Sequence, residues 1–408
     1  MDTPAIAPPS WTSQRLGRVG QAWLAAFGLL FALGVGAWIY QLTQGLIATG
    51  MRDVVSWGLY IFTFAFFVGL SAGGLIVASA AEVFGVQSLK PLARIGVLTA
   101  AACVAIAAMT IIPDLGRPER VYNLFLHPHW SSPLIWDVLI IIVYFVFAVV
   151  DLGVMTSRGS STARRARAIR LLAYVGLPTA VLLHSITAWI FGLQISRPLW
   201  NTALMAPLFV TSAVLSGTAL VTLVVLAASR FDRFELTRAT RDSLCTLMAV
   251  TLAIDLFLVG SDYLTIIWGN VPRDRAALNL ILPGGSWQWL FWLEWVVGGA
   301  IPFVLLVARR ARSSAWAVAA ASALVMVGVY AFRIELVVGG MLKPLLHLPP
   351  GIAVGTYHTT QTSFQYDGLY HPTWVEYSIV AGLMALLAGI ITLGYRWLRN
   401  RDQAVAAA

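Results

Sequence analysis

Long hydrophobic runs separated by short polar connections dominate the pattern along the chain. About 20 apolar residues in a helix cross a hydrocarbon layer roughly 30 Å thick, and runs of this length recur throughout the sequence. The pattern predicts ten membrane-spanning helices, over residues 20–42, 55–84, 93–113, 133–156, 168–194, 204–229, 243–268, 286–308, 314–338 and 376–397. The predicted fold class is therefore an all-α, polytopic transmembrane protein without a sizeable soluble domain.

The composition agrees with a chain that faces lipid. Of the 408 residues, 59% are hydrophobic and only 11% are charged, whereas a soluble domain carries roughly 25% charged residues. The net charge of +9 does not indicate a nucleic-acid partner, because the arginines form short clusters between hydrophobic runs. No small-residue cleavage motif follows the first run at the usual distance, so we expect a retained helix rather than a signal peptide.

The basic residues predict the orientation in the membrane. If the N-terminus is cytoplasmic, nineteen of the 27 Lys and Arg residues fall in cytoplasmic segments and seven in external ones. Because cytoplasmic loops carry an excess of basic residues, both termini are predicted to be cytoplasmic. The longest connection, residues 339–375, is then external, and it is either a functional or partner-docking loop or a passive linker.

Few ionisable residues lie within the predicted helices. Each is a functional candidate, because a charge at the centre of a membrane helix costs about 2.5–3.5 kcal/mol on insertion scales. They are Asp114, Asp137, His184, Asp255, Asp262, Glu294, Arg333, Glu335 and Glu376. With the predicted orientation, His184 and Asp255 lie near the midplane and the others toward the outside, while the cytoplasmic half holds only Glu82 and Asp151 near its interface.

Some of these residues have structural explanations. An ion pair between Arg333 and Glu294 or Asp262 would hold two helices together, and His184 could be a satisfied core residue. Asp114 and Arg117 lie at a helix end, where capping and solvation explain them. Asp137 is harder to explain in this way, because Trp136 and Tyr144 accompany it just inside the membrane. This combination suits a pocket for an aromatic ligand that carries protons.

The available side chains limit the chemistry. Haem is not expected, because only His184 of the six histidines lies within a helix and membrane b-type haem normally uses paired helix histidines. Two cysteines, Cys103 and Cys245, are too few for an iron–sulfur cluster, and nucleotide-binding and zinc motifs are absent from the sequence. A quinone site needs only an apolar slot, hydrogen-bonding side chains and a proton acceptor. Its electrons would then pass to a partner subunit.

Several local sequences resemble those of a known family. They are Trp57–Tyr60 and Phe67–Gly74, Asp114–Pro118, Ser132–Asp137, His184 with Trp189 and Phe191, Glu294–Pro302, Arg333–Gly340, and Pro372–Glu376. Together they cover residues 50–400 and resemble the NrfD/PsrC-type (polysulfide reductase) membrane subunits, in their longer ten-helix form. The family often has Glu where this chain has Asp262, which leaves the role of that position open.

The resemblance implies a fold, a site and partners. Predicted helices 2–5 and 6–9 would form two four-helix bundles, with helices 1 and 10 peripheral, giving regions 1–54, 55–200, 201–340 and 341–408. A menaquinone or ubiquinone would bind near the outer surface of the first bundle. Its candidate contacts are Trp57, Asp114, Arg117, Trp136, Asp137, Tyr144 and His184. The implied partners are an external four-cluster iron–sulfur subunit and commonly a molybdopterin catalytic subunit, in a bacterial cytoplasmic (inner) membrane.

We therefore predict a quinone-interacting membrane subunit of a respiratory oxidoreductase complex. Asp137 or Asp114 would accept the proton, with Arg117 and His184 as hydrogen-bonding groups. A second set could relay protons, although no chain of acids continues into the cytoplasmic half; it comprises Asp255, Asp262, Glu294, Arg333 and Glu335. The rival prediction is a secondary transporter, but transporters often break helices at the midplane, whereas Gly and Pro here cluster near helix ends. A purely structural anchor would leave Asp137 without a role.

Overall fold

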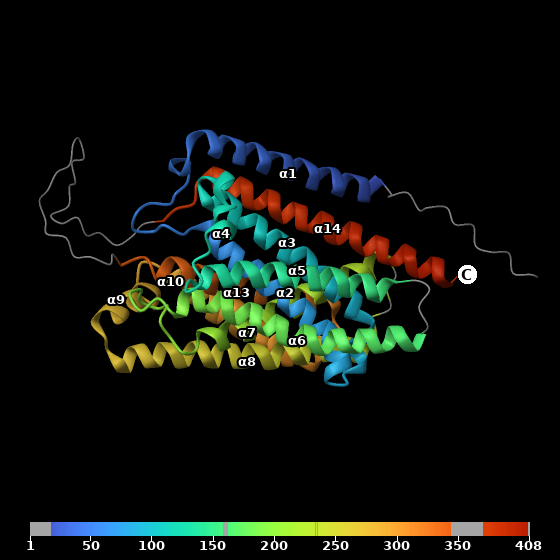
Figure 1. The fold of residues 1–408 in the computed structure, drawn as a ribbon. Coiled ribbons are helices and arrows are strands. Elements are labelled where there is room, and N and C mark those ends of the chain that lie inside the picture. Colours follow the sequence, from blue (N-terminus) through green and yellow to red (C-terminus); the bar gives the residue numbers. More distant parts are fainter. Residues whose placement is uncertain (1–17, 158–161, 233, 235, 344–369, 407–408) are drawn as a thin grey trace, which may run out of the picture.

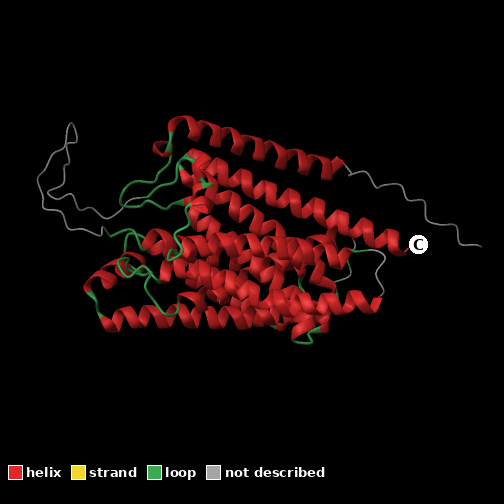
Figure 2. Cartoon of the chain, in the orientation of Figure 1, coloured by secondary structure: helices red, strands yellow, loops and turns green. Residues whose placement is uncertain are grey.

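The protein is built almost entirely from long helices. The computed structural model describes residues 18–406, apart from 158–161, 233, 235 and 344–369. Figure 2 shows helices and loops, and no strand, in this part of the chain. Ten helical segments among the described residues are long and apolar enough to cross a membrane, which confirms the predicted number.

The helix boundaries follow the hydrophobic runs closely. The spanning segments are α1 (Arg18–Gln44), α2 (Leu59–Val83), α3 (Ala93–Ile111), α5 (Pro133–Thr156), α6 (Thr162–Gly192), α7 (Met205–Asp232), α8 (Arg238–Gly269), α10 with η5 and α11 (Gln288–Phe291, Trp292–Ala300, Ile301–Val307), α13 with η6 (Ala315–Ile334, Glu335–Gly339), and α14 (Trp374–Ala406). Short helices in the connections are η1 (Leu46–Ala48), η2 (Gln87–Leu92), η3 (Ile112–Leu115), η4 (Pro118–Arg120), α4 (Asn123–Leu126), α9 (Pro272–Ile281) and α12 (Arg309–Ser313).

The helices lie side by side around α2. Nearly every residue of α2 is buried, because it packs against α3, α6 and α7. In contrast, α1 packs mainly against α14 at the edge of the molecule, as Figure 1 shows. The first residues of α1 and the last residues of α14 lie at the same end (Figure 1).

The two predicted bundles are not separate in their contacts. Within the first, α5 packs on α6 and α2 on α3, and within the second, α7 packs on α8 and α13. However, α2 also contacts α7 and α13, so it belongs to both sets of contacts. The division at residue 200 therefore stays a prediction.

The contact between α2 and α7 depends on two glycines. A Cβ atom at Gly73 would lie 2.2 Å from the carbonyl oxygen of Ala213 and 2.6 Å from the Cα atom of Gly217. Small residues allow membrane helices to approach this closely, and close approach maximises their van der Waals contact. Gly73 and Gly217 therefore set the distance between these two central helices.

Two segments that the pattern predicted as plain helix are π-helical. They are η5, which carries Glu294, and η6, which carries Glu335. A π-helical turn inserts an extra residue into a helix and often occurs at functional sites. Hydrophobic periodicity does not reveal such an insertion, because the residues on both sides of it remain apolar.

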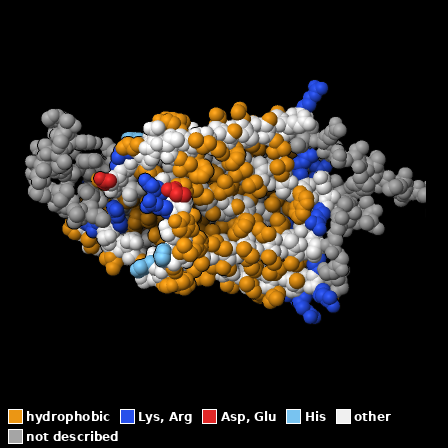
Figure 3. Space-filling view, turned by 45° about the horizontal axis from the view of Figure 1, so that its top comes forward, with side chains coloured by type: hydrophobic (Ala, Val, Ile, Leu, Met, Phe, Trp, Pro, Cys, Tyr) orange, Lys and Arg blue, Asp and Glu red, His pale blue; other side chains and the backbone are white. Residues whose placement is uncertain are grey.

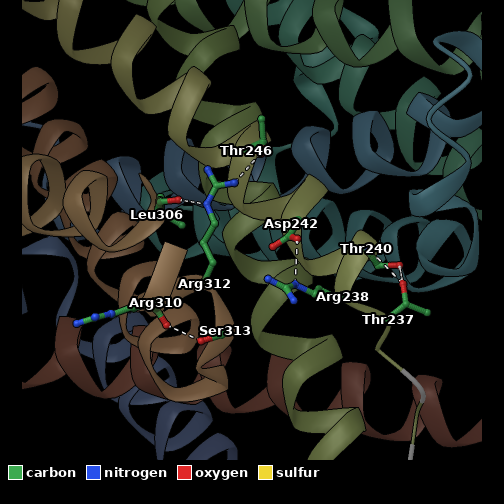
Figure 4. A network of polar contacts seen from close by, with 9 residues as sticks. All are labelled: Thr237, Arg238, Thr240, Asp242, Thr246, Leu306, Arg310, Arg312 and Ser313. Atoms are coloured by element: carbon green, nitrogen blue, oxygen red, sulfur yellow. Dashed lines mark hydrogen bonds and ion pairs between the residues drawn. The ribbon is translucent and has the colours of Figure 1, made fainter. Parts of the chain in front are cut away.

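The surface matches a membrane-embedded protein. Figure 3 shows a broad hydrophobic zone on one face, with Lys and Arg side chains toward the ends. Figure 4 shows part of the end that holds the chain termini, where Arg238 lies 3.8 Å from Asp242 and Arg312 donates to Thr246 over 3.1 Å. Most of the long connection lies outside the described residues, so its predicted role stays a prediction.

Candidate functional site

Asp137 lies in the interior of the helix bundle rather than at its surface. Its side chain is only 2% exposed and accepts a 2.6 Å hydrogen bond from the hydroxyl of Thr187. Pro133 starts α5, so Asp137 lies in the second turn of this helix. Because Thr187 belongs to α6, this hydrogen bond joins α5 to α6.

His184 lies one helical turn before Thr187 on the same face of α6. Its imidazole is 1% exposed, and its Nε2 atom has no hydrogen-bond partner among the described residues. A Cβ atom built at Gly69 would lie 3.8 Å from this Nε2 and 3.5 Å from the hydroxyl of Ser216. The imidazole therefore faces the bare backbone of α2 and a polar side chain of α7. A buried nitrogen without a partner is unusual and marks a position where a ligand or water can bind.

A group of aromatic side chains lies further along α6, toward the end of the molecule opposite the chain termini, which is called the outer end below. Phe191 follows Thr187 by one turn, and its ring packs edge-on against Trp57 at 5.9 Å and Trp200 at 5.1 Å. Trp57 and Trp200 stack on each other with centroids 5.6 Å apart. Among these aromatics, Trp57 was the only one predicted as part of the site.

Tyr144 lies seven residues after Asp137 and on the same buried face of α5. Its hydroxyl donates a 3.0 Å hydrogen bond to the carbonyl of Ser71 on α2. This hydroxyl is therefore already engaged, and Tyr144 lies two helical turns from the carboxylate along α5.

The structure separates two predicted residues from this group. Trp136 is 49% exposed and donates to the carbonyl of Trp130 over 2.8 Å, because neighbouring helix positions point in different directions. Arg117 is exposed in the connection between η3 and η4. The position of Trp136 next to Asp137 in sequence, and of Arg117 near a helix end, therefore did not predict that either lies with Asp137 in the structure.

A separate polar cluster ties the outer ends of α1, α2 and α14 together. Glu376 is fully buried and accepts hydrogen bonds from Gly50 N at 2.6 Å, Tyr370 Oη at 2.5 Å and Thr373 N at 2.9 Å. Tyr370 Oη in turn accepts from Leu59 N at 2.6 Å. Burial, and then the neighbouring Glu376 carboxylate, raise the pKa of Tyr370 well above its usual value. The phenol therefore stays protonated and donates to Glu376.

Asp114 lies beside this outer cluster. Tyr60 Oη donates to Gln41 Oε1 at 2.5 Å, and Gln41 Nε2 donates to the carbonyl of Pro113 at 2.7 Å. Asp114 follows Pro113 directly, and its buried Oδ1 has no hydrogen-bond partner among the described residues. The structure shows no direct contact between Asp114 and the Asp137 group.

Tyr370→Phe is expected to destabilise the protein. The substitution removes the proton donated to Glu376 and the acceptor for Leu59 N–H, which leaves two buried polar groups short of a partner. The expected loss is about 1–3 kcal/mol per unsatisfied group, measured as a lower midpoint of thermal unfolding. Tyr377→Phe is the matched control, because that side chain is 57% exposed. An equal effect of both substitutions would contradict this role for Tyr370.

The acidic residues of α8 have threonine partners. Asp262 accepts from Thr202 at 2.6 Å, and Asp255 accepts from Thr211 on α7 at 3.1 Å. A small cavity of about 20 Å³ adjoins Asp262, Tyr263 and Glu335. This is room for about one water molecule, which could connect the two carboxylates.

Arg333 forms no ion pair with a carboxylate of the described residues, contrary to one of the expected explanations. The side chain is fully buried, donates to Ser212 Oγ at 2.6 Å and lies 3.9 Å above the ring of Phe209. Phe209 also packs against Phe191 at 5.9 Å. The guanidinium therefore reaches the aromatic group of the Asp137 site, a link through α7 that the sequence did not reveal.

The two glutamates in π-helical segments remain short of partners. Both carboxylate oxygens of Glu294 and one of Glu335 have no hydrogen-bond partner within the described part of the chain. The other oxygen of Glu335 accepts from Tyr263 Oη. Such buried acids require protonation, water or a ligand.

A larger cavity opens elsewhere at the outer end. It has a volume of about 640 Å³ and lies between α2, α13 and α14, with Tyr330, Tyr370 and His371 among its lining residues. Asp137 and His184 do not line it. It is therefore distinct from the site built on α5 and α6.

Comparison with known proteins identifies relatives along nearly the whole chain. The profile of the family described as "Polysulphide reductase, NrfD" matches residues 47–344. The chain is 38% identical over 411 residues to a putative membrane subunit of dimethyl sulfoxide reductase from Halobacterium salinarum, covering 96% of this chain and 94% of that protein. It is also 28% identical to the Hdr-like menaquinol oxidoreductase integral membrane subunit of Archaeoglobus fulgidus, over 90% of this chain and 89% of the relative.

A more distant relative has a similar length. The integral membrane subunit of menaquinone reductase from Nitratidesulfovibrio vulgaris is 21% identical, over 92% of this chain and 90% of the relative. The family profile covers α2 to α13, which includes every side chain of the Asp137 group. The chain therefore belongs to the NrfD family of polysulphide reductase membrane subunits, in a form with ten spanning helices.

Proposed function

We propose that this chain is the quinone-interacting membrane subunit of a respiratory oxidoreductase complex. The observation that carries the proposal is the buried Asp137–Thr187 pair, one helical turn from the unpartnered Nε2 of His184. Membership of the NrfD family and the menaquinone-related names of two relatives support it. The same family membership and names favour this role over secondary transport.

The Asp137 group fits a quinone by the chemistry of its side chains. A quinone ring needs apolar or aromatic surfaces and a hydrogen-bonding partner for each carbonyl. Trp57 and Phe191 provide aromatic surface, His184 Nε2 is free to bond one oxygen, and Asp137 is available to the other. Menaquinone and ubiquinone both have an aromatic-sized ring with two such carbonyls. When bound, the quinol form supplies two electrons and two protons.

Within this site, Asp137 would act as the proton acceptor. Thr187 donates to its Oδ1 and leaves Oδ2 for the exchanged proton. His184 would orient the ring through Nε2 and accept a second proton. Because both side chains are almost fully buried, bulk water is kept from the exchange.

The electrons would leave or arrive through a partner. The described residues contain no group of side chains able to hold a metal ion, and we propose a four-cluster iron–sulfur subunit on the external face, together with a molybdopterin catalytic subunit. The aromatic group of Trp57, Phe191 and Trp200 lies toward that face if both termini are cytoplasmic. The distribution of basic residues supports this orientation, and we propose a bacterial cytoplasmic membrane as the location.

The acids of the second half could serve a separate proton route. Asp262 and Glu335 border the same small cavity, Asp255 accepts from Thr211, and Glu294 has no hydrogen-bond partner among the described residues. Arg333 connects this set with the aromatic group through Phe209. A role in proton transfer remains a proposal for these residues.

Purification of the chain from its native host tests the proposed function. We expect an iron–sulfur protein to co-purify with it, and about one quinone per chain to be recovered by organic extraction. Addition of a short-chain quinol, or of the reductant for the partner enzyme, should change the electron paramagnetic resonance signal of the clusters. The control is the same chain purified alone and reconstituted into liposomes, which should transport no solute. Uptake by the chain alone, without co-purifying clusters, would favour the transporter and overturn the proposal.

A further inference from the structure

A polar cavity lies between the helices at the end of the molecule that holds the chain termini. It has a volume of about 270 Å³ and is formed by the ends of α2, α3, α5 and α6 together with η2. Its described charged lining residues are Glu82, Lys90, Arg94, Asp151, Arg165 and Arg170. None of them belongs to the Asp137 group or to the outer cluster.

The inner wall of this cavity carries an acid that has one oxygen without a partner. Asp151 is 2% exposed, and its Oδ1 atom has no hydrogen-bond partner among the described residues. A buried carboxylate oxygen is costly unless a water or another occupant of the cavity donates to it. An occupant that offers an N–H or O–H group at this depth would remove that cost.

The mouth of the cavity is basic instead. Lys90 and Arg170 lie 3.5 and 3.9 Å from Glu82, yet their side chains are 62% and 68% exposed. Arg165 donates to the carbonyl of Met155, which holds its guanidinium at the rim. The described lining residues include four basic and two acidic side chains, so the rim favours a negative group.

We propose that this cavity binds the headgroup of a membrane phospholipid. The phosphate would lie at the rim against Lys90, Arg165 and Arg170, and a hydroxyl or ammonium group two carbons further would donate to Asp151. The position supports a lipid, because the cavity lies where the hydrophobic helices end. Basic pockets between membrane helices at such an interface are known to bind lipid headgroups. Phosphatidylglycerol and phosphatidylethanolamine both have the required donor, whereas phosphatidylcholine has none.

The inference does not depend on the proposed role in quinone chemistry. It concerns the opposite end of α5 and is tested by binding rather than turnover. The test uses the full chain in detergent after removal of native lipid. Each of the three phospholipids is then added back, and binding is measured by native mass spectrometry together with the midpoint of thermal unfolding.

Phosphatidylglycerol and phosphatidylethanolamine are expected to bind and to raise the unfolding midpoint. Phosphatidylcholine should bind at least about tenfold more weakly, because it cannot donate to the carboxylate. Asp151→Leu should abolish this preference. Arg170→Gln should weaken the binding of phosphatidylglycerol about fivefold. Arg238→Gln is the control and should change nothing, because Arg238 lies at the same end outside the cavity (Figure 4).

Three results would overturn the proposal. The first is equal binding of all three lipids to the wild-type chain, and the second is an unchanged preference in Asp151→Leu. The third is an equal rise of the unfolding midpoint with glycerophosphoglycerol and with phosphatidylglycerol. Glycerophosphoglycerol has no acyl chains, so this result would identify the occupant as a free solute. Arg170→Gln keeps the test informative if Asp151→Leu does not fold, because Arg170 is exposed and its replacement leaves the interior unchanged.

Discussion

Replacing Asp137 by asparagine is expected to abolish quinone-linked turnover while the complex still assembles. Asparagine has nearly the same size and can accept the Thr187 hydrogen bond through Oδ1, but it cannot take up a proton. A positioned general base contributes about 10²–10⁴ to a rate, and turnover should fall by that factor. The measurement is oxidation or reduction of a soluble quinone analogue, normalised to the iron content of the purified complex.

Two further variants make this result specific. Asp137→Glu restores a carboxylate and should recover part of the turnover, whereas Asp242→Asn removes an exposed one and should leave turnover unchanged. Turnover of Asp137→Asn at the wild-type level would exclude Asp137 as the proton acceptor. Loss of assembly in the same variant would instead indicate a structural role.

The second large effect is expected at the contact between α2 and α7. Gly73→Ala places a methyl group 2.2 Å from the carbonyl oxygen of Ala213, so the two helix backbones must move apart. Overpacking of this kind costs about 1–3 kcal/mol, or more where backbone is displaced. We expect a clearly lower midpoint of thermal unfolding and a smaller yield of folded protein in detergent.

Gly153→Ala is the matched control for this prediction. Gly153 lies in α5, and no heavy atom outside its own helix lies within 4 Å of a Cβ atom built there. Alanine has the higher helix propensity, so this variant should be as stable as the parent or slightly more stable. If Gly73→Ala behaved like Gly153→Ala, the tight contact between α2 and α7 would be wrong.

The sequence predicted the helices well, because a single physical requirement determines them. A segment that crosses lipid has to be long, apolar and helical, and each of the ten predicted runs contains such a helix. The boundaries at Pro133 and Thr156 were predicted to the residue. The π-helical segments carrying Glu294 and Glu335 were not predicted, because they depend on how α13 packs against η5.

The candidate site was predictable only in part. Asp137 and His184 stand out in sequence because polar groups in lipid are costly. Their partners do not stand out, because threonine and serine are common in membrane helices, where they can bond to their own backbone. Thr187 does both, since its Oγ1 lies 2.6 Å from Asp137 Oδ1 and 3.0 Å from the carbonyl oxygen of Leu183, and its single proton is shared between them. The partners of Arg333 were not predictable either. A serine and a phenyl ring occupy the place where a carboxylate was expected.

The outer cluster could not be predicted because it joins distant parts of the chain. Glu376 accepts a hydrogen bond from Gly50, 326 residues earlier in the sequence. No local pattern around Gly50 indicates a carboxylate partner. Tyr370 falls in the long connection predicted over residues 339–375, where no local pattern indicates that its hydroxyl links Leu59 to Glu376.

The packing of α1 on α14 has a consequence for how the protein is made. The main partner of α1 is α14, which follows it after eight other spanning segments, so α1 must wait in the bilayer until α14 has been synthesised. The family profile, residues 47–344, leaves out both helices. Because α14 also packs on α3 and α2, it would keep part of its support without α1, whereas α1 without α14 would lose its main partner.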